Sequence, residues 1–225
     1  SLFEYISSGQ PNKESDLFFC QKESFAFYEE LKTLAPEGTA EVDVLKQLLG
    51  ASGMEYGSLP KGLLKFHKYP SGARTPLEEH LVEAAEYASD GQKARLHFTV
   101  SPEHRARFEA LVARLSPIWS SHFGIEFEVT FSEQKPATDT VAVNMDNSLF
   151  READGSLLFR PAGHGALLEN LNDLSADIIF IKNIDNVIQN HIEVISKYKK
   201  ALAGILLEKQ EKIFAFLKAL EQSTV

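Results

Sequence analysis

Asp177-Ile178-Ile179-Phe180-Ile181 is the stretch that decides the expected fold, because it is a continuous apolar run of strand length. A parallel strand buried on both faces has this composition, since helices cover each side of its sheet. Leu96, Phe98 and Val100 alternate with polar residues, and residues 125–131 do the same. Helical patterns separate these runs, and strands that alternate with helices predict an open α/β sheet.

Helices are expected on either side of the first alternating strand. Thr75-Pro76-Leu77-Glu78 is a capping box with Pro at the first helical position, and its helix is expected to run to about Ala88. Ser101-Pro102 precedes a second helix, whose apolar residues are spaced three or four apart: Phe108, Leu111, Val112 and Leu115. Short strands are expected at 139–143 and 157–159, and a further helix at 165–174.

The two ends of the chain are expected to be helical. Residues 1–57 form a helical segment that we interpret as an insertion, 58–187 form the α/β core, and 188–225 form one long amphipathic helix. Seven-residue apolar rows in that helix are interrupted by lysines, so they form no perfect coiled-coil seam. The rows are Ile188, Ile195 and Leu202, and Ile192, Leu206, Ile213 and Leu220. We expect them to pack on the chain's own sheet; the alternative is an interaction surface, including one for a homo-oligomer. No internal repeat is evident.

Composition limits the partners and the compartment. The 225 residues carry 23 Lys+Arg against 32 Asp+Glu, a net charge of −9. That balance argues against sequence-independent nucleic-acid binding, which needs a positive surface. Cys20 is the single cysteine, and no apolar run is long enough to cross a membrane. We therefore expect a cytoplasmic protein. The start, without Met, indicates a fragment of a longer chain.

Lys182-Asn183-Ile184-Asp185-Asn186 is the first candidate site, because it directly follows the expected buried strand. Ligands of open α/β sheets bind beyond the carboxyl ends of the strands. Asp185 in that position can hold Mg²⁺, which uses one or two carboxylates and bridges substrate phosphates. The alternative is that Asp185 and Asn186 cap the following helix.

Two loops give further candidates. In the loop Arg160 to Gly165, Gly163 and Gly165 let the backbone approach a ligand, with His164 between them. The alternative is a tight turn with a surface histidine. Lys61, in a constrained loop before a short strand, can reach a phosphate as a compact charge, or is simply exposed.

Arg74, at a helix start, adds a guanidinium that can bind a ligand or face solvent. Gln134, which follows the alternating strand, can bind a base or sugar edge. The chain has no metal-type His/Cys spacing, no Gly-x-Ser-x-Gly elbow and no Gly-x-x-x-x-Gly-Lys-Ser/Thr loop.

The order of these segments carries a resemblance. The first segment, Pro60-Lys61-Gly62-Leu63-Leu64, resembles half of the nucleotidyltransferase signature. The second, Pro161-Ala162-Gly163-His164-Gly165, resembles the Pro-x-Gly-His-Gly loop of UDP-sugar pyrophosphorylases. The third, residues 179–186, is similar to the strand of the same enzymes that ends in Asn-x-Asp-Asn. Residues 131–136 fall where that family has a Gln-containing loop. Residues 58–187 also resemble an uncharacterised bacterial domain-of-unknown-function family, a divergent branch of the nucleotide-diphospho-sugar transferase superfamily.

The resemblance implies a glycosyltransferase-A-like, Rossmann-related fold with a mixed open sheet. It implies uridylyltransferase-like chemistry, in which a sugar-1-phosphate attacks the α-phosphate of an NTP and pyrophosphate leaves. Lys61 would contact phosphate, Gly163 and His164 would lie against base and ribose, and Asp185 would hold Mg²⁺. The nucleotide-binding set would also include Arg74, Gln134, Gly165, Asn183 and Asn186.

The chain departs from the family pattern in two respects. The glycine-rich phosphate loop that should precede Lys61 and the second metal-binding Asp expected downstream are both missing from this sequence. Two alternatives therefore stay open: a sugar-nucleotide-dependent glycosyltransferase, and a non-catalytic binding or scaffold domain of the same fold.

Overall fold

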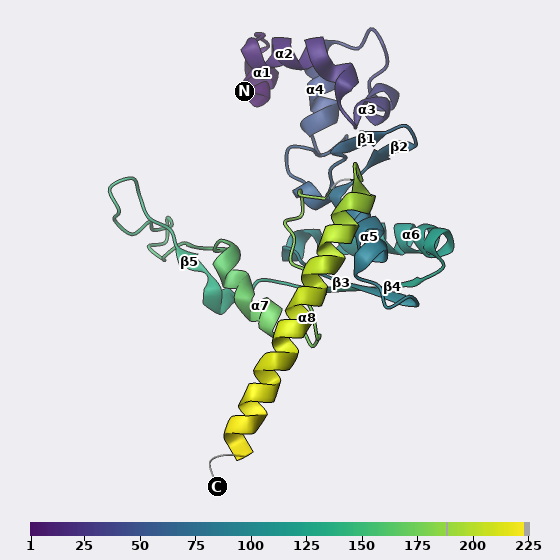
Figure 1. Cartoon of the computed structure of the whole chain (residues 1–225). Coiled ribbons are helices and arrows are strands. Elements are labelled where there is room, and N and C mark those ends of the chain that lie inside the picture. Colours follow the sequence, from purple (N-terminus) through teal and green to yellow (C-terminus); the bar gives the residue numbers. More distant parts are fainter. Residues whose placement is uncertain (188, 223–225) are drawn as a thin grey trace. The chain divides into compact units, whose positions relative to one another are not determined.

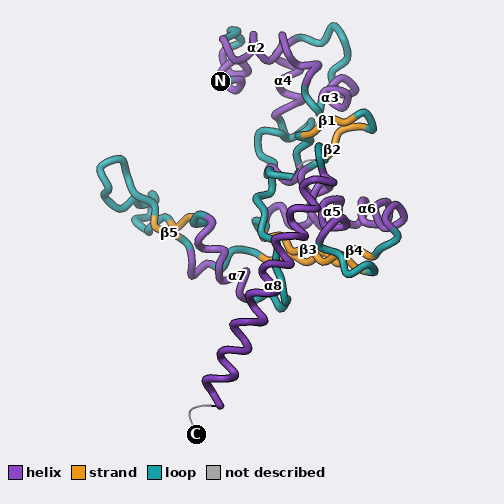
Figure 2. The backbone as a smooth tube through the Cα atoms, in the orientation of Figure 1, coloured by secondary structure: helices purple, strands orange, loops and turns teal. Residues whose placement is uncertain are grey.

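The computed structural model describes residues 1–187 and 189–222. Its fold is mixed α/β, with mostly helices, small two-stranded sheets and a long C-terminal helix (Figures 1 and 2). The chain separates into two compact units. The first contains Ser1–Glu83 and Lys182–Val194, and the second contains Ala84–Ile181 and Ile195–Val225. The sequence boundaries at residues 57 and 187 stay predictions.

Four helices open the first unit, as the sequence predicts for residues 1–57: α1 (Leu2–Ser8), α2 (Lys13–Gln21), α3 (Tyr28–Leu34) and α4 (Glu41–Leu49). Ser1 and Asn12 cap α1 and α2, each through a capping box. These helices share one core, in which Leu45 and Leu31 are almost completely buried. The rings of Phe18, Phe25 and Phe27 stack along its edge.

The first unit continues into a hairpin and a buried helix. A 3₁₀ turn, Lys61–Leu63, leads to β1 (His67–Tyr69), which pairs antiparallel with β2 (Gly72–Arg74). The expected loop feeding a short strand is therefore confirmed. The helix α5 (Pro76–Tyr87) follows, and Thr75 Oγ1 accepts a hydrogen bond from the Glu78 amide at 3.3 Å, as the capping box predicts.

The second unit is built around one β-α-β element. The strand β3 (Lys93–Thr99) pairs parallel with β4 (Glu126–Ser132), and α6 (Arg105–Phe123) connects them after a short 3₁₀ turn. Phe98, Phe131 and Phe108 pack between sheet and helix. The opposite face of β4 is polar and more exposed, which agrees with the alternation of apolar and polar residues in 125–131.

After β4 the chain forms an exposed arm. The strands β5 (Thr140–Val141) and β6 (Phe159–Arg160) pair antiparallel, and two tight turns lie between them. In each turn an Asp accepts from the amide and the hydroxyl of the Ser two residues on: Asp146 from Ser148 and Asp154 from Ser156. The two turns therefore share one hydrogen-bond pattern.

The sequences at the two turns are similar, Asp146-Asn147-Ser148-Leu149 in the first and Asp154-Gly155-Ser156-Leu157 in the second. Asn147 and Gly155 occupy the same place in the two turns and both have positive φ, 65° and 85°. Asn and Gly are the residues that tolerate this backbone region best, which explains why these two types match.

The apolar run that was expected to decide the fold forms no strand. Residues 177–181 are irregular, and Ile181 is 72% exposed. The open mixed sheet expected from the sequence is correspondingly not seen: the described strands form three separate pairs. An apolar run supplies side chains but no hydrogen-bond partner, and no described strand pairs with this one. Phe180 packs instead on Tyr87, with ring centroids 4.8 Å apart.

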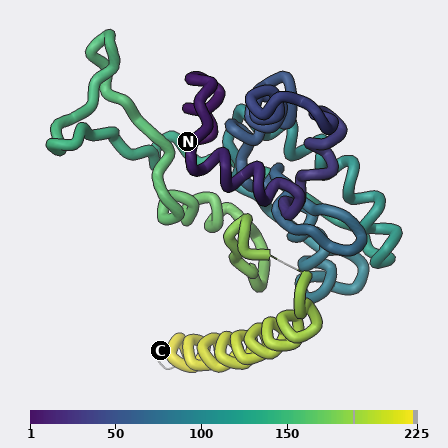
Figure 3. Tube along the Cα trace, turned by 90° about the horizontal axis from the view of Figure 1, so that it is seen from above, coloured from purple at the N-terminus to yellow at the C-terminus, as the bar shows by residue number. Residues whose placement is uncertain are grey.

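A 3₁₀ turn (His164–Leu167) and α7 (Leu168–Asn172) occupy the expected helix at 165–174. The last helix, α8 (Ile192–Gln222), is a single continuous rod (Figure 3). Its apolar rows do not pack on the sheet as expected: Leu202, Ile213 and Leu220 are all more than half exposed. Ile188, the first residue of one row, lies outside the described residues. No helix within the described part of the chain is long and apolar enough to cross a membrane.

We expect Leu45→Ala to destabilise the first unit by about 2–5 kcal/mol, because it deletes a fully buried side chain and leaves a cavity. Leu17→Ala, at an exposed position of α2, is the matched control, with an expected effect within about 0.5 kcal/mol. Urea unfolding followed by circular dichroism measures both. Equal midpoints for the two variants would show that the helices do not share the core described.

Candidate functional site

Lys61 and Asp185 lie 124 positions apart in the sequence and form a direct ion pair. Lys61 Nζ donates to Asp185 Oδ2 at 2.6 Å, and both residues belong to the first unit. The Lys61 side chain is 62% exposed and that of Asp185 29% exposed, so the pair opens to solvent. The Lys61 ammonium, followed by the Asp185 amide, holds the pKa of the Asp185 carboxyl below its ordinary value.

Asp185 sits in a tight turn in which the Asn186 amide donates to the Asn183 carbonyl at 3.2 Å. The side chains of Asn183 and Asn186 are exposed, so their amides are accessible to a ligand beside the ion pair. The next residue, Val187, is 1% exposed and anchors the end of the turn. The fold of the first unit therefore brings Lys61 to the turn that contains Asn183, Asp185 and Asn186.

The chemistry of these side chains fits a hard cation held mainly by water and phosphate. Asp185 offers one accessible carboxylate, and Mg²⁺ requires only one or two from the protein. Among the described residues no group of three or more His, Cys, Asp or Glu side chains forms a closed metal cage. A site of this composition would take Mg²⁺ together with a phosphate ligand rather than alone.

Arg74, also in the first unit, lies at a buried carboxylate. Its guanidinium is 3.8 Å from Glu79 Oε2, and His67 Nδ1 is 3.6 Å from Glu79 Oε1. The Glu79 side chain is fully buried, and neither of its oxygens has a hydrogen-bond partner within the normal length among the described residues. Burial, together with Glu79, raises the pKa of the nearby Tyr69 phenol to about 12. Arg74 thus compensates the buried charge of Glu79. If Arg74 also bound a ligand, its guanidinium would have to interact with both.

Four predicted residues belong to the second unit: Gln134, Gly163, His164 and Gly165. Gln134 Nε2 donates to Asp139 Oδ1 at 3.0 Å, so its amide is already engaged. Gly163 precedes the 3₁₀ turn that contains His164 and Gly165, and all three are exposed. The turn is followed by α7, of five residues, so it presents at most a short run of amides.

A hydrogen-bond network on the polar face of β3 and β4 was missed by the sequence reading. His97 Nε2 and Ser132 Oγ are 2.8 Å apart, and His97 Nδ1 is 2.8 Å from Thr130 Oγ1. Ser132 Oγ also meets Asn170 Nδ2 at 2.9 Å and Thr99 Oγ1 at 3.2 Å.

The pair of Ser132 and His97 has the separation of a nucleophile and its base. Asn170 Nδ2, however, donates to the same oxygen, and Thr99 Oγ1 also lies within hydrogen-bond distance of it. The network therefore ties α7 to the end of β4. No sequence signal finds it, because strand register alone aligns His97 with Thr130 and Thr99 with Ser132.

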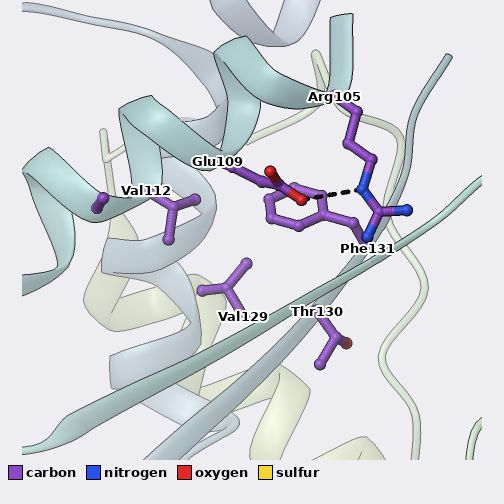
Figure 4. A pocket seen from close by; sticks show the side chains of 7 residues that line it. Arg105, Glu109, Val112, Val129, Thr130 and Phe131 are labelled. Carbon is purple, nitrogen blue, oxygen red and sulfur yellow. Dashed lines mark hydrogen bonds and ion pairs between the residues drawn. The ribbon is translucent and has the colours of Figure 1, made fainter. Parts of the chain in front are cut away.

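One hollow of about 460 Å³ lies between α6 and β4 and contains none of the predicted residues (Figure 4). It is lined by Arg105, Glu109, Val112, Ala113, Val129, Thr130 and Phe131. Arg105 turns toward Glu109, and its Nε donates to Glu109 Oε1 at 2.9 Å. The charged groups at this hollow thus satisfy each other.

Comparison with known proteins gives one match. A family model described as "Domain of unknown function (DUF4301)" matches residues 4–225. No curated protein matches the chain, and no solved structure matches it either.

The buried His80 gives a pH prediction. Burial lowers the pKa of its ring below the ordinary 6.5, against the opposing effects of the Ile184 backbone and Glu83. As the pH falls, the His80 ring therefore takes up a proton at a higher pH in the unfolded chain than in the folded chain. The contribution of neutral His80 to stability is present above pH 6.5 and is lost as the pH falls below that value. We expect His80→Gln to lose less stability than wild type between about pH 7.5 and about pH 5. Urea midpoints at the two pH values measure this; parallel losses would contradict it.

Proposed function

Because the chain belongs to the DUF4301 family, we propose that this family is a divergent branch of the nucleotide-diphospho-sugar transferases and that the first unit carries its phosphate and metal site. The pairing of Lys61 with Asp185 is the observation that supports this most. The resemblance assigns a phosphate contact to one residue and Mg²⁺ to the other. The contact joins two residues 124 positions apart to which the resemblance assigns complementary parts of one ligand, a phosphate and a cation.

The proposed reaction joins a sugar-1-phosphate to a nucleoside triphosphate. A phosphate oxygen of the sugar-1-phosphate attacks the α-phosphorus, the bond from that phosphorus to the β-phosphate oxygen breaks, and pyrophosphate leaves. Mg²⁺ would supply neutralisation of the phosphate charge. The chain's part is positioning: Lys61 holds a phosphate oxygen, Asp185 holds the cation, and Asn183 and Asn186 offer amides. Such catalysis needs no side-chain nucleophile.

In the free chain Lys61 takes the place of the cation at Asp185. A ligand phosphate offers Lys61 a second anion, and the Asp185 carboxylate then becomes available to Mg²⁺. Lys61 would thus exchange Asp185 for the ligand phosphate, and Asp185 would exchange Lys61 for the cation. This exchange predicts effects of opposite sign for the metal alone and for the metal with nucleotide.

We expect Lys61→Ala to tighten Mn²⁺ binding in the absence of nucleotide by about two- to fivefold, because a competing positive charge leaves Asp185. The same variant should lose about tenfold or more of its affinity for Mn²⁺-UTP, because a charge-assisted phosphate contact is gone. Paramagnetic resonance of free Mn²⁺ measures the affinity for the metal alone, and isothermal titration calorimetry measures the affinity for Mn²⁺-UTP. Lys65→Ala, which removes an ion pair with Glu30 in the same unit, is the matched control for both.

Asp185→Asn keeps the shape of the side chain and removes its charge, so it should abolish metal-dependent UTP binding. Pyrophosphate release on addition of sugar-1-phosphates then identifies the transferase reaction. Binding of nucleotide-sugars without that release would indicate a glycosyltransferase. A chain that binds neither metal-UTP nor nucleotide-sugars is a scaffold, and the proposal is then wrong.

A further inference from the structure

Two contacts connect α5 to the turn that carries Asp185. His80 Nε2 lies 3.2 Å from the Ile184 carbonyl oxygen, and Lys182 Nζ lies 3.1 Å from Glu83 Oε1. His80 and Glu83 are three residues apart on a helix, so they project from the same face. Their partners lie one and three residues before Asp185. The helix therefore fixes the main chain directly before the carboxylate.

In each of these contacts the donor and the acceptor can be assigned. A carbonyl oxygen only accepts hydrogen bonds, so His80 Nε2 must carry the hydrogen that lies between it and Ile184. The Glu83 side chain is 3% exposed, and a buried carboxylate is costly without a cation beside it. Lys182 supplies that cation. Both contacts are made by groups that lie against the helix, which favours a held turn over a mobile one.

We infer that His80 and Glu83 are positioning residues, which hold the turn of residues 182–186 so that the Asp185 carboxylate faces Lys61. The consequence for ligand binding rests on the proposed function, whereas the holding of the turn is a property of the chain itself. Neither residue has to touch nucleotide or metal. They act through the backbone of Ile184 and the side chain of Lys182.

The Asn186 amide reports directly on this turn, because it donates to the Asn183 carbonyl and closes it. We expect His80→Leu to speed hydrogen exchange of that amide about tenfold, the effect of losing one hydrogen bond. His80→Gln keeps an amide N–H that can reach Ile184 and should exchange like wild type. The Leu45 amide in the core of the same unit is the internal reference and should not change.

Unchanged Asn186 exchange in His80→Leu overturns the inference. So does equal acceleration at Asn186 and Leu45, since His80 would then support the whole unit and not the turn. If His80→Leu does not fold, the ring nitrogens of wild type decide the matter by nitrogen NMR. A hydrogen on Nε2 supports the contact with Ile184, and a hydrogen on Nδ1 overturns it.

The effect on binding separates this inference from the proposed function. Where wild type binds Mn²⁺-UTP, His80→Leu should bind it about tenfold more weakly and His80→Gln like wild type. Equal affinities in all three, together with faster Asn186 exchange, show that Asp185 needs no such support and overturn the positioning role. Absence of binding in wild type contradicts the proposed function alone, and the exchange experiment still decides whether α5 holds the turn.

Discussion

Burial of two carboxylates on one helix is the constraint on which the first unit depends. Glu79 and Glu83 of α5 are 0% and 3% exposed, and a buried carboxylate is tolerated only where positive or hydrogen-bonding groups surround it. Glu79 faces Arg74 and His67 of the β1–β2 hairpin, and Glu83 faces Lys182. One helix thereby fixes segments that lie about a hundred positions apart.

The ion pair of Lys61 and Asp185 depends on that arrangement and differs from it in character. The pairs on α5 are internal, whereas Lys61 and Asp185 are partly open to solvent. An exposed pair of this kind contributes little to stability, because water screens both charges. Its residues are therefore free to exchange partners when a ligand brings its own phosphate and cation. The buried charges require their partners to stay in place, whereas the exposed pair is the one suited to binding.

Local signals predicted the elements well and the sheet poorly. The Thr75 cap and the alternation before Phe131 each describe a few neighbouring residues, and the structure shows the Thr75–Glu78 hydrogen bond and the strand that they predict. Residues 177–181 could form a strand only beside another strand, and the composition of the run does not show whether such a strand lies next to it. The exposed apolar rows of α8 show the same limit, since the spacing that predicts an amphipathic helix says nothing of what covers it.

The sequence by itself determined the helices and short strands, the acidic charge, and the residue types of the candidate site. Motif order also singled out Lys61 and Asp185 separately, from two short segments. Only the tertiary structure decided that the two meet at 2.6 Å, that Arg74 compensates the buried Glu79, and that His80 and Glu83 hold the turn beside Asp185. Periodicity and capping act over a few residues, whereas charge pairing across long separations follows from which helix face is buried.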